Sequence, residues 1–475
     1  MRGRVASSKA ALFLLCATAS CALLNEERSE VREQPNIVLV VADDLGWGDL
    51  GCYGQEKIST PALDRMAAEG MRFTDFYAGC TVCAPSRSVL MTGKHMGHTY
   101  IRGNGGKPLP DEEVTVAEVL QEAGYATGGF GKWGLGLAGS EGVPTKQGFD
   151  EFFGFLSQVH AHNHYPTFLL DGEERVELSN VVPNEGRHGQ GKASEKNEYA
   201  TDLIFERARA FIREQADGPF FCFLPITVPH ANNEAGKEGM EVPSYGQYAD
   251  RDWRDPMKGY AAMVSNIDAE VGSILELLRE LGLEEDTLVL FTSDNGSHSE
   301  GGYNPNFFDS NGPLRGNKRS LHDGGIRVPL IARWPGVVSA GVESDHISYF
   351  GDFFETAAEL AGAAPSAGLD SVSMLPELRG EPDAQRAHDH LYWQFHEWKG
   401  AEAVRFGRWK AIRNPIHSGE LRLYDLEVDI HEWKDLAAEQ PEVAARAASL
   451  MAASHTPSDH PMWLLKHERP AKRGE

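Results

Sequence analysis

Apolar strands and amphipathic helices alternate along most of the chain, and this alternation constrains the fold more than any other feature. The first strand, Asn36–Ala42, is a continuous apolar run, which is typical of a strand buried on both faces of a sheet. Further strands are predicted at 125–130, 220–225, 287–292 and 328–332, with helices at 61–69, 116–123, 198–214 and 257–281. The pattern predicts an α/β fold in which a mostly parallel central sheet is flanked by helices.

The C-terminal quarter of the chain has a different pattern. A helix at 353–361 is followed by a linker rich in Gly, Pro and Ser. Short strands separated by turns are then predicted at 390–395, 403–406, 409–413 and 420–425, with a helix near 442–453. Because 475 residues exceed the size at which one core stops growing, we predict two units. These are an α/β domain over 35–365 and a small antiparallel α+β subdomain over 366–475.

The first 24 residues have the pattern of an export leader. Arg2 and Arg4 precede an apolar run at 10–19 that is too short to span a membrane. Small residues after this run suit ordinary signal cleavage, whereas the sequence at 18–21 resembles a bacterial lipobox that would make Cys21 a lipidated N-terminus. Both alternatives predict export, either to the periplasm or to a lipoprotein anchored in the outer membrane.

Net charge and cysteine content exclude several classes of partner and site. The 70 acidic residues outnumber the 45 basic ones, and the formal net charge of −25 argues against nucleic acid. It also argues against an anionic membrane surface, so a lipid anchor is the only membrane contact we predict. Six cysteines are too few for a disulfide scaffold in a chain this long. Cys80 and Cys83 form a single C-x-x-C pair, and no second pair completes a zinc site.

The segment Cys83-Ala84-Pro85-Ser86-Arg87 carries the strongest chemical signal. Pro85 suits the first turn of a helix, which places Cys83 at or just before the helix N-terminus. Backbone N–H groups at such an end favour an anion such as a sulfate or phosphate oxygen. They would also lower the pKa of a thiol, so an unmodified cysteine nucleophile is one alternative. A buried core thiol is the other.

Carboxylates follow two of the predicted strands at their carboxyl ends. Asp43 and Asp44 come directly after the first strand, and Asp294 and Asn295 come after the strand at 287–292. Open α/β folds place ligand groups at these strand ends. Three carboxylates and one amide oxygen form a hard-oxygen set that suits Ca²⁺ or Mg²⁺ better than zinc. The alternative for Asp294-Asn295-Gly296 is a hairpin turn.

Together these motifs resemble the formylglycine-dependent (type I) sulfatases of the alkaline-phosphatase superfamily, and bacterial polysaccharide sulfatases most closely. The resemblance implies an alkaline-phosphatase-like fold and a sulfatase domain over 35–365. It also implies that a formylglycine-generating enzyme oxidises Cys83 to formylglycine (3-oxoalanine), whose hydrate attacks sulfur while Arg87 holds it. The metal, usually calcium with Mg²⁺ as an alternative, would be bound by Asp43, Asp44, Cys83, Asp294 and Asn295.

Three basic residues match positions with known roles in that family. The resemblance implies that Lys132 and Lys318 contact the sulfate group. It implies that His230, in Thr227-Val228-Pro229-His230, protonates the leaving alcohol, which is ordinary general-acid work for imidazole. Taken alone, each lysine fits a solvated surface charge and the histidine fits a structural role.

The chain departs from the family pattern at Gly134. Many members carry a histidine here that assists the nucleophile. The nearby segment at 157–165 is rich in histidine, and we predict that His162 or His160 supplies the missing group, with His160 also a candidate for substrate binding. Simple surface exposure of this segment is the alternative.

The substrate is expected to be a sulfated carbohydrate, or another sulfate ester. Several blocks resemble polysaccharide sulfatases, and Arg102 and Asn104 are candidate sugar contacts in a site for galactose or N-acetylgalactosamine sulfate. Two alternatives remain: a phosphomonoesterase or phosphonate monoester hydrolase of the same superfamily, and a non-catalytic surface lipoprotein that binds sulfated glycans.

Overall fold

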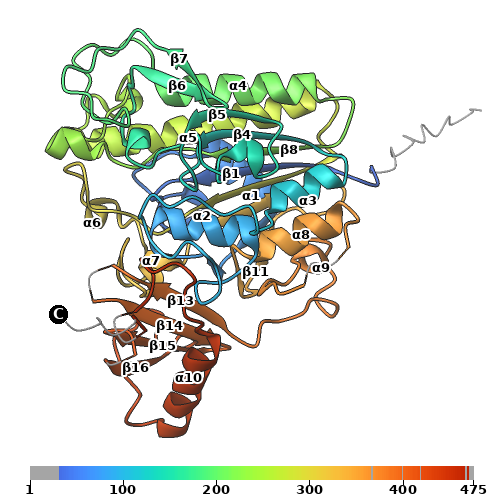
Figure 1. Ribbon diagram of the computed structural model, residues 1–475, viewed down its shortest axis with the longest axis vertical. Coiled ribbons are helices and arrows are strands. Elements are labelled where there is room, and N and C mark those ends of the chain that lie inside the picture. Colours follow the sequence, from blue (N-terminus) through green and yellow to red (C-terminus); the bar gives the residue numbers. More distant parts are fainter. Residues whose placement is uncertain (1–31, 365–366, 398, 418, 466–467, 470–475) are drawn as a thin grey trace, which may run out of the picture.

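The computed structural model describes residues 32–469 apart from 365–366, 398, 418 and 466–467. Figure 1 shows a large sheet between two layers of helices, with the red C-terminal elements forming a separate layer at one end. The predicted leader, including Cys21, lies outside the described residues. Within the described part, no helix has the length and apolar character that crossing a membrane requires.

The central sheet has ten strands in the order β11-β2-β10-β9-β1-β8-β4-β5-β6-β7. Its middle is parallel: β1 (Asn36–Ala42) lies between β9 (Thr287–Ser293) and β8 (Phe220–Pro225), and β4 (Ala126–Lys132) pairs with β8. The flanking strands are β5 (Glu151–Phe155), β6 (Phe168–Asp171), β7 (Glu174–Glu177), β10 (Leu330–Arg333), β2 (Met71–Phe73) and β11 (Val342–Ser344). The predicted α/β fold with a mostly parallel sheet is confirmed.

Strand β1 explains why the central strands have continuous apolar sequences. Val38 and Val40 face one apolar cluster, whereas Ile37 and Leu39 face another. One layer of helices consists of α1 (Pro61–Ala68), α4 (Ala200–Glu214) and α5 (Asp255–Glu280), and the other of α2 (Cys83–Thr92), α3 (Val116–Glu122) and α8 (Asp352–Leu360). Since both faces of β1 are covered, the residues between Ile37 and Ala42 are all apolar.

The C-terminal subdomain is a four-stranded antiparallel sheet covered by one helix (Figure 1). Its elements are β13 (Leu391–Phe395), β14 (Ala401–Phe406), β15 (Trp409–Asn414), β16 (Glu420–Asp425) and α10 (Pro441–Ser454). Trp393 on β13 donates its indole N–H to the backbone oxygen of Ala78 at 2.9 Å, so this sheet packs close to the start of α2. The remaining short elements are β3 (Phe76–Tyr77), β12 (Ser348–Tyr349), α6 (Pro305–Phe308), α7 (Asp323–Ile326) and α9 (Leu375–Leu378).

Candidate active site

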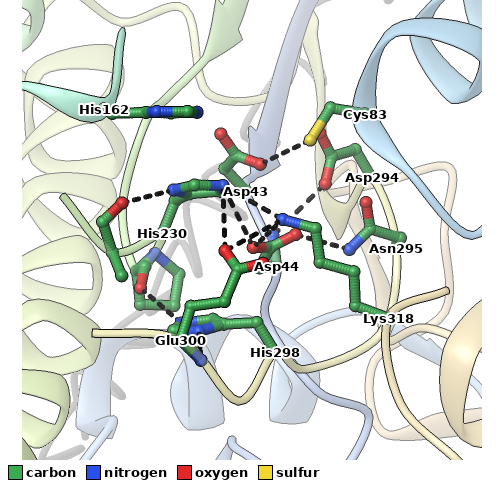
Figure 2. Close-up of polar contacts among 12 residues, drawn as sticks. Asp43, Asp44, Cys83, His162, His230, Asp294, Asn295, His298, Glu300 and Lys318 are labelled. Carbon is green, nitrogen blue, oxygen red and sulfur yellow. Dashed lines mark hydrogen bonds and ion pairs between the residues drawn. The ribbon is translucent and has the colours of Figure 1, made fainter. Parts of the chain in front are cut away.

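The carboxyl ends of the four central strands bring the predicted site residues to one edge of the sheet. Asp43 follows β1, Asp294 follows β9, Lys132 ends β4 and His230 lies five residues beyond β8. Figure 2 shows most of these groups pointing toward one another around Cys83, which enters from the first residue of α2. The predicted helix start at Cys83 is confirmed. The sheet topology therefore assembles a site from segments that are far apart in the sequence.

Cys83 is buried and lies against a carboxylate. Cys83 is 3% exposed, and its Sγ lies 3.3 Å from Oδ1 of Asp43. Burial and the negative charge of Asp43 raise the pKa of the Cys83 thiol well above its ordinary value. The helix N-terminus does not lower this pKa as we predicted for an unmodified nucleophile, because burial and the neighbouring charge dominate.

Three carboxylates share this centre with three cationic side chains. Asp43 Oδ2 lies 2.6 Å from Lys132 Nζ, and Asp44 Oδ2 lies 2.7 Å from Lys318 Nζ. Arg87 donates to Oδ2 of Asp294 through Nε at 3.1 Å and Nη2 at 2.8 Å. The structure therefore brings six of the predicted residues into direct contact as three ion pairs. Arg87 also donates Nη1 to the backbone oxygen of Lys132 at 2.5 Å, which ties α2 to the end of β4.

The donor set fits a divalent cation. One donor atom each from Asp43, Asp44, Cys83 and His230 lie within 4.8 Å of one another. The Asn295 amide donates Nδ2 to Asp44 at 2.6 Å, while its Oδ1 is buried and has no hydrogen-bond partner among the described residues. A buried acceptor without a donor is costly, and a cation would satisfy it. Carboxylate and amide oxygens of this kind suit Ca²⁺ or Mg²⁺.

The carboxyl groups of Asp43 and Asp294 differ in pKa in this arrangement. Burial raises the pKa of Asp43, but Lys132 and other nearby cations outweigh burial and hold it well below its ordinary value. For Asp294, burial and the charge of Asp43 raise the pKa to about 7. Like charges held this close disfavour one another unless a cation lies between them. This crowding of carboxylates supports a cation site between them.

His230 is held as a neutral imidazole beside Lys318. Its Nδ1 lies 2.7 Å from the backbone oxygen of Ala231 and therefore donates its proton there. Its Nε2 lies 3.0 Å from Nζ of Lys318 and accepts from the ammonium group. Burial and the Lys318 charge lower the pKa of His230 well below its ordinary value. The lone pair of Nε2 therefore faces the cationic centre and is bonded to the ammonium group of Lys318.

The histidine-rich segment divides into one residue that reaches the site and one that does not. The ring of His162 stacks on that of His230, with centroids 4.7 Å apart and planes 9° apart, on the side shown at the top of Figure 2. His160 is 1% exposed, and its ring packs between Phe155 and Phe168. The structure therefore does not support substrate binding or nucleophile assistance by His160, because it is a core residue.

Arg102 and Asn104, the two predicted sugar contacts, are placed differently in the structure. Arg102 is 3% exposed, and its three guanidinium nitrogens donate to backbone oxygens of Thr99, Thr456 and Gly97 at 3.0, 2.7 and 2.8 Å. The structure does not support a substrate contact for Arg102, since its donors stabilise a loop. Asn104 accepts from the backbone N–H of Ala84 at 3.0 Å. Its side chain therefore caps the first turn of α2 beside Cys83.

Glu300 is a member of the site that the motifs did not indicate. Its Oε2 lies 3.6 Å from Lys318 Nζ and 3.8 Å from His230 Nε2, and Arg319 donates to its Oε1 at 2.6 Å. Although burial raises the pKa of Glu300, Lys318 outweighs burial and lowers the pKa to about 2. Its only signal in the sequence was its position six residues after Asp294, which many surface glutamates would share.

A cavity of about 530 Å³ lies where the segment that follows Lys318 meets the C-terminal sheet. Arg319 lines it and connects it to the site through Glu300. The other side of the cavity includes Lys399, Arg422 and Tyr424 from the C-terminal subdomain. Charged groups and an aromatic ring around a space of this size suit a polar ligand of sugar dimensions.

Two family models match this chain, and between them they cover both sheets. The model described as Sulfatase matches residues 35–363, and the model described as N-sulphoglucosamine sulphohydrolase, C-terminal, matches residues 316–453. N-acetylgalactosamine-6-sulfatase of Canis lupus familiaris is 36% identical over 73% of this chain and 66% of that protein, so the chain spans just under two thirds of that relative. N-acetylgalactosamine-6-O-sulfatase of Bacteroides thetaiotaomicron is 30% identical over 91% of this chain and 95% of that protein. The chain belongs to the sulfatase family, as the motifs predicted.

Solved structures agree with this assignment. Ps i-CgsB in complex with k-i-k-neocarrahexaose has a TM-score of 0.73 and 28% sequence identity, covering 88% of this chain and 92% of the other. The phosphonate monoester hydrolase of Agrobacterium radiobacter has a TM-score of 0.60 and 21% identity, covering 88% and 95%. The second likeness shows a common fold alone, and it is the fold predicted from the superfamily resemblance.

Proposed function

We propose that this protein hydrolyses a sulfate monoester carried by a carbohydrate. One observation carries the proposal in a chain of the sulfatase family. Cys83, at the N-terminus of a ten-residue helix, meets three carboxylates and two lysines at the carboxyl edge of a parallel sheet. A negatively charged ester that enters this centre finds the ammonium groups of Lys132 and Lys318 already in place.

The metal would be held by Asp43, Asp44, Asp294 and Asn295, with residue 83 beside them. Bound Ca²⁺, with Mg²⁺ as the alternative, would neutralise charge on the sulfate oxygens. Conversion of Cys83 to formylglycine by a formylglycine-generating enzyme would provide an oxygen nucleophile, which a thiol with a raised pKa does not. Burial of Cys83 keeps bulk water away from that atom.

The basic residues then have separate tasks. Lys132 and Lys318 are protonated and close to the centre, so they bind and orient the sulfate group. His230 is neutral in the free protein, and a bound anion would favour its protonated form. Its Nδ1 is fixed by Ala231, so Nε2 is the atom that carries a proton to the leaving alcohol. Glu300 stays ionised and balances the charge of Lys318.

A carbohydrate substrate is supported by the relatives and by the adjoining cavity. Two relatives are named as N-acetylgalactosamine-6-sulfatase or N-acetylgalactosamine-6-O-sulfatase, and a solved relative is in complex with k-i-k-neocarrahexaose. The cavity beside Arg319 has the size and polarity for a neighbouring sugar unit. We therefore propose a sulfated galactose or N-acetylgalactosamine unit as the substrate class.

Turnover of paired aryl esters tests the reaction. We expect calcium-dependent release of nitrophenol from nitrophenyl sulfate, and of inorganic sulfate from N-acetylgalactosamine 6-sulfate, with little hydrolysis of nitrophenyl phosphate. Cys83→Ala should be inactive, and mass spectrometry of the wild-type peptide should show an aldehyde at position 83. Faster phosphate than sulfate hydrolysis would instead identify a phosphomonoesterase. Binding of sulfated glycans by calorimetry without sulfate release would identify a non-catalytic glycan-binding protein.

A further inference from the structure

Lys318 has an N–H donor that the free protein leaves unused. An ammonium group carries three N–H donors. Nζ of Lys318 lies 2.7 Å from Oδ2 of Asp44 and 3.0 Å from Nε2 of His230, and these contacts account for two of the donors. Oε2 of Glu300 lies 3.6 Å from Nζ, which is too long for a hydrogen bond. The third N–H of Lys318 therefore has no partner within the described part of the chain.

Glu300 is held just outside bonding distance of Lys318 by a second cation. Figure 2 shows its carboxyl group beside Lys318 and His230. Oε1 accepts from Nη1 of Arg319 at 2.6 Å, whereas Oε2 is buried and has no hydrogen-bond partner among the described residues. A buried acceptor without a donor is costly, and a small movement of the carboxyl group would bring Oε2 onto Lys318. The ion pair with Arg319 opposes this movement.

The backbone at Arg319 adopts a strained conformation. Its φ of 73° lies in the left-handed region, which disfavours residues with a Cβ atom. The N–H of Arg319 donates to the oxygen of Thr81 at 3.1 Å, and the N–H of Lys318 donates to the oxygen of Ser297 at 2.9 Å. Adjacent side chains of an extended segment point to opposite sides, whereas Lys318 and Arg319 both reach Glu300. The two backbone bonds fix the strained turn that brings both cations to one carboxylate.

Glu300 would compete strongly for the unused N–H of Lys318 if Arg319 released it. The carboxylate is ionised, and ionised oxygens accept strong hydrogen bonds from an ammonium group. A sulfate group that binds Lys318 needs the same donor, because both anions are acceptors only. Since Glu300 belongs to the same chain, its effective concentration beside Lys318 would exceed that of a dissolved anion. Sulfate binding therefore depends on keeping the Glu300 carboxylate in its present position.

We propose that Arg319 is a positioning residue that holds Glu300 away from Lys318 and so keeps one N–H of Lys318 available to the sulfate group. This inference rests on the proposed function. Arg319 acts on the sulfate through Glu300 rather than by direct contact. Glu300 in turn keeps a negative charge near Lys318 without occupying the donor.

Calorimetry of inorganic sulfate binding to the calcium-loaded enzyme tests this role. Arg319→Gln removes the charge, so Glu300 should move onto Lys318. The dissociation constant should rise by about tenfold, the effect of losing one charge-assisted hydrogen bond to the anion. Glu300→Gln removes the competing anion and should bind sulfate at least as tightly as the wild type. Mass spectrometry of the residue 83 peptide ensures that the compared proteins carry the same fraction of aldehyde.

The double variant distinguishes competition from a merely structural ion pair. With Glu300 replaced by Gln, loss of Arg319 should no longer matter, so the dissociation constant should return to within about twofold of that of Glu300→Gln. A structural ion pair predicts instead that both single variants lose affinity equally. Equal losses, or a double variant as weak as Arg319→Gln, overturn the proposal.

Arg319→Gly separates the ion pair from the backbone strain. Glycine adopts a φ of 73° without strain, so the thermal midpoint should stay the same or rise. The dissociation constant for sulfate should nevertheless rise as in Arg319→Gln, because Glu300 is released in both variants. Wild-type affinity for sulfate in Arg319→Gly overturns the role of Arg319.

The matched control is Arg207→Gln. Arg207 donates Nε to Oε1 of Glu151 at 2.6 Å, the same length as the pair between Arg319 and Glu300, and it is also partly exposed. Glu151 begins β5 at the opposite edge of the sheet, so sulfate affinity should be unchanged. Absence of sulfatase activity in a wild type that binds sulfate overturns the proposed function and leaves the role of Arg319 standing. A wild type that neither binds nor releases sulfate overturns both.

Discussion

Asp323→Asn should destabilise the protein by removing one charge from a buried cluster that joins α7 to the C-terminal sheet. Asp323 begins α7 and is completely buried, with Oδ1 2.5 Å from Nζ of Lys410 in β15. Lys410 is also completely buried and lies 3.0 Å from Oε1 of Glu432. The opposite oxygen of Asp323 accepts from Tyr77 at 3.0 Å. The cluster fixes the segment that follows Lys318 against the C-terminal sheet.

Loss of one partner from a buried ion pair costs about 3–5 kcal/mol, because the remaining charge is left without compensation. Lys410 keeps Glu432 as a counter-ion, so we expect a loss of about 3 kcal/mol, at the lower end of that range. The free energy of unfolding should be measured by urea titration for Asp323→Asn, Lys410→Met and the double variant. The double variant should lose less than the sum of the single losses, since the two residues interact directly. Additive losses would refute the reasoning.

The same variant should show an acid-dependent signature. Burial raises the pKa of Asp323, but Lys410 and Arg327 outweigh burial and hold the pKa below its ordinary value of 3.8. A carboxylate with a lowered pKa stabilises the folded state above its unfolded pKa, and this contribution disappears as the pH falls through the folded value. The stability difference between wild type and Asp323→Asn should therefore be constant near neutral pH and decrease below about pH 4. A difference that persists unchanged until acid unfolding contradicts the charge explanation.

Three further changes test individual residues of the site. Asn295→Leu should weaken calcium binding in calorimetry, because it removes the buried unpaired oxygen. Equal calcium affinities of Asn295→Leu and the wild type would argue against this donor set. The wild-type protein should also bind calcium more tightly in the presence of sulfate. His162→Ala should lower kcat by about tenfold through loss of the ring stacked on His230, whereas wild-type turnover would count against any role for His162. Arg102→Leu should lower the thermal midpoint with KM unchanged, and a raised KM would restore Arg102 as a sugar contact.

Strand positions and the meeting of the acidic residues at one edge of the sheet were predictable from the sequence because local patterns determine them. Asn36–Ala42 forms β1 with the predicted bounds, since seven consecutive buried positions require a strand covered on both faces. The acidic residues after β1 and β9 meet because parallel neighbouring strands end at the same edge of the sheet. Pro85 likewise marked the first turn of α2.

The residues around the central carboxylates and lysines were not predictable from local patterns. His160 and His162 are two residues apart in one short helical turn, yet one lies in the core and the other stacks on His230. Arg102 was predicted as a sugar contact, but backbone oxygens of Thr99 and Gly97 in its own loop and of the distant Thr456 bind its guanidinium group. These positions depend on tertiary contacts that no short sequence window contains.

The ion pairs of the centre imply that metal binding and anion binding are linked. Lys132 and Lys318 pair with Asp43 and Asp44, the carboxylates that would hold a cation. Burial lowers the pKa of each lysine, but the carboxylates outweigh burial and raise it above the ordinary value, so both ammonium groups are charged. A divalent cation competes for the same carboxylate charge and weakens both ion pairs, which leaves two ammonium groups available to a sulfate anion. By linkage, the anion must strengthen cation binding by the same factor.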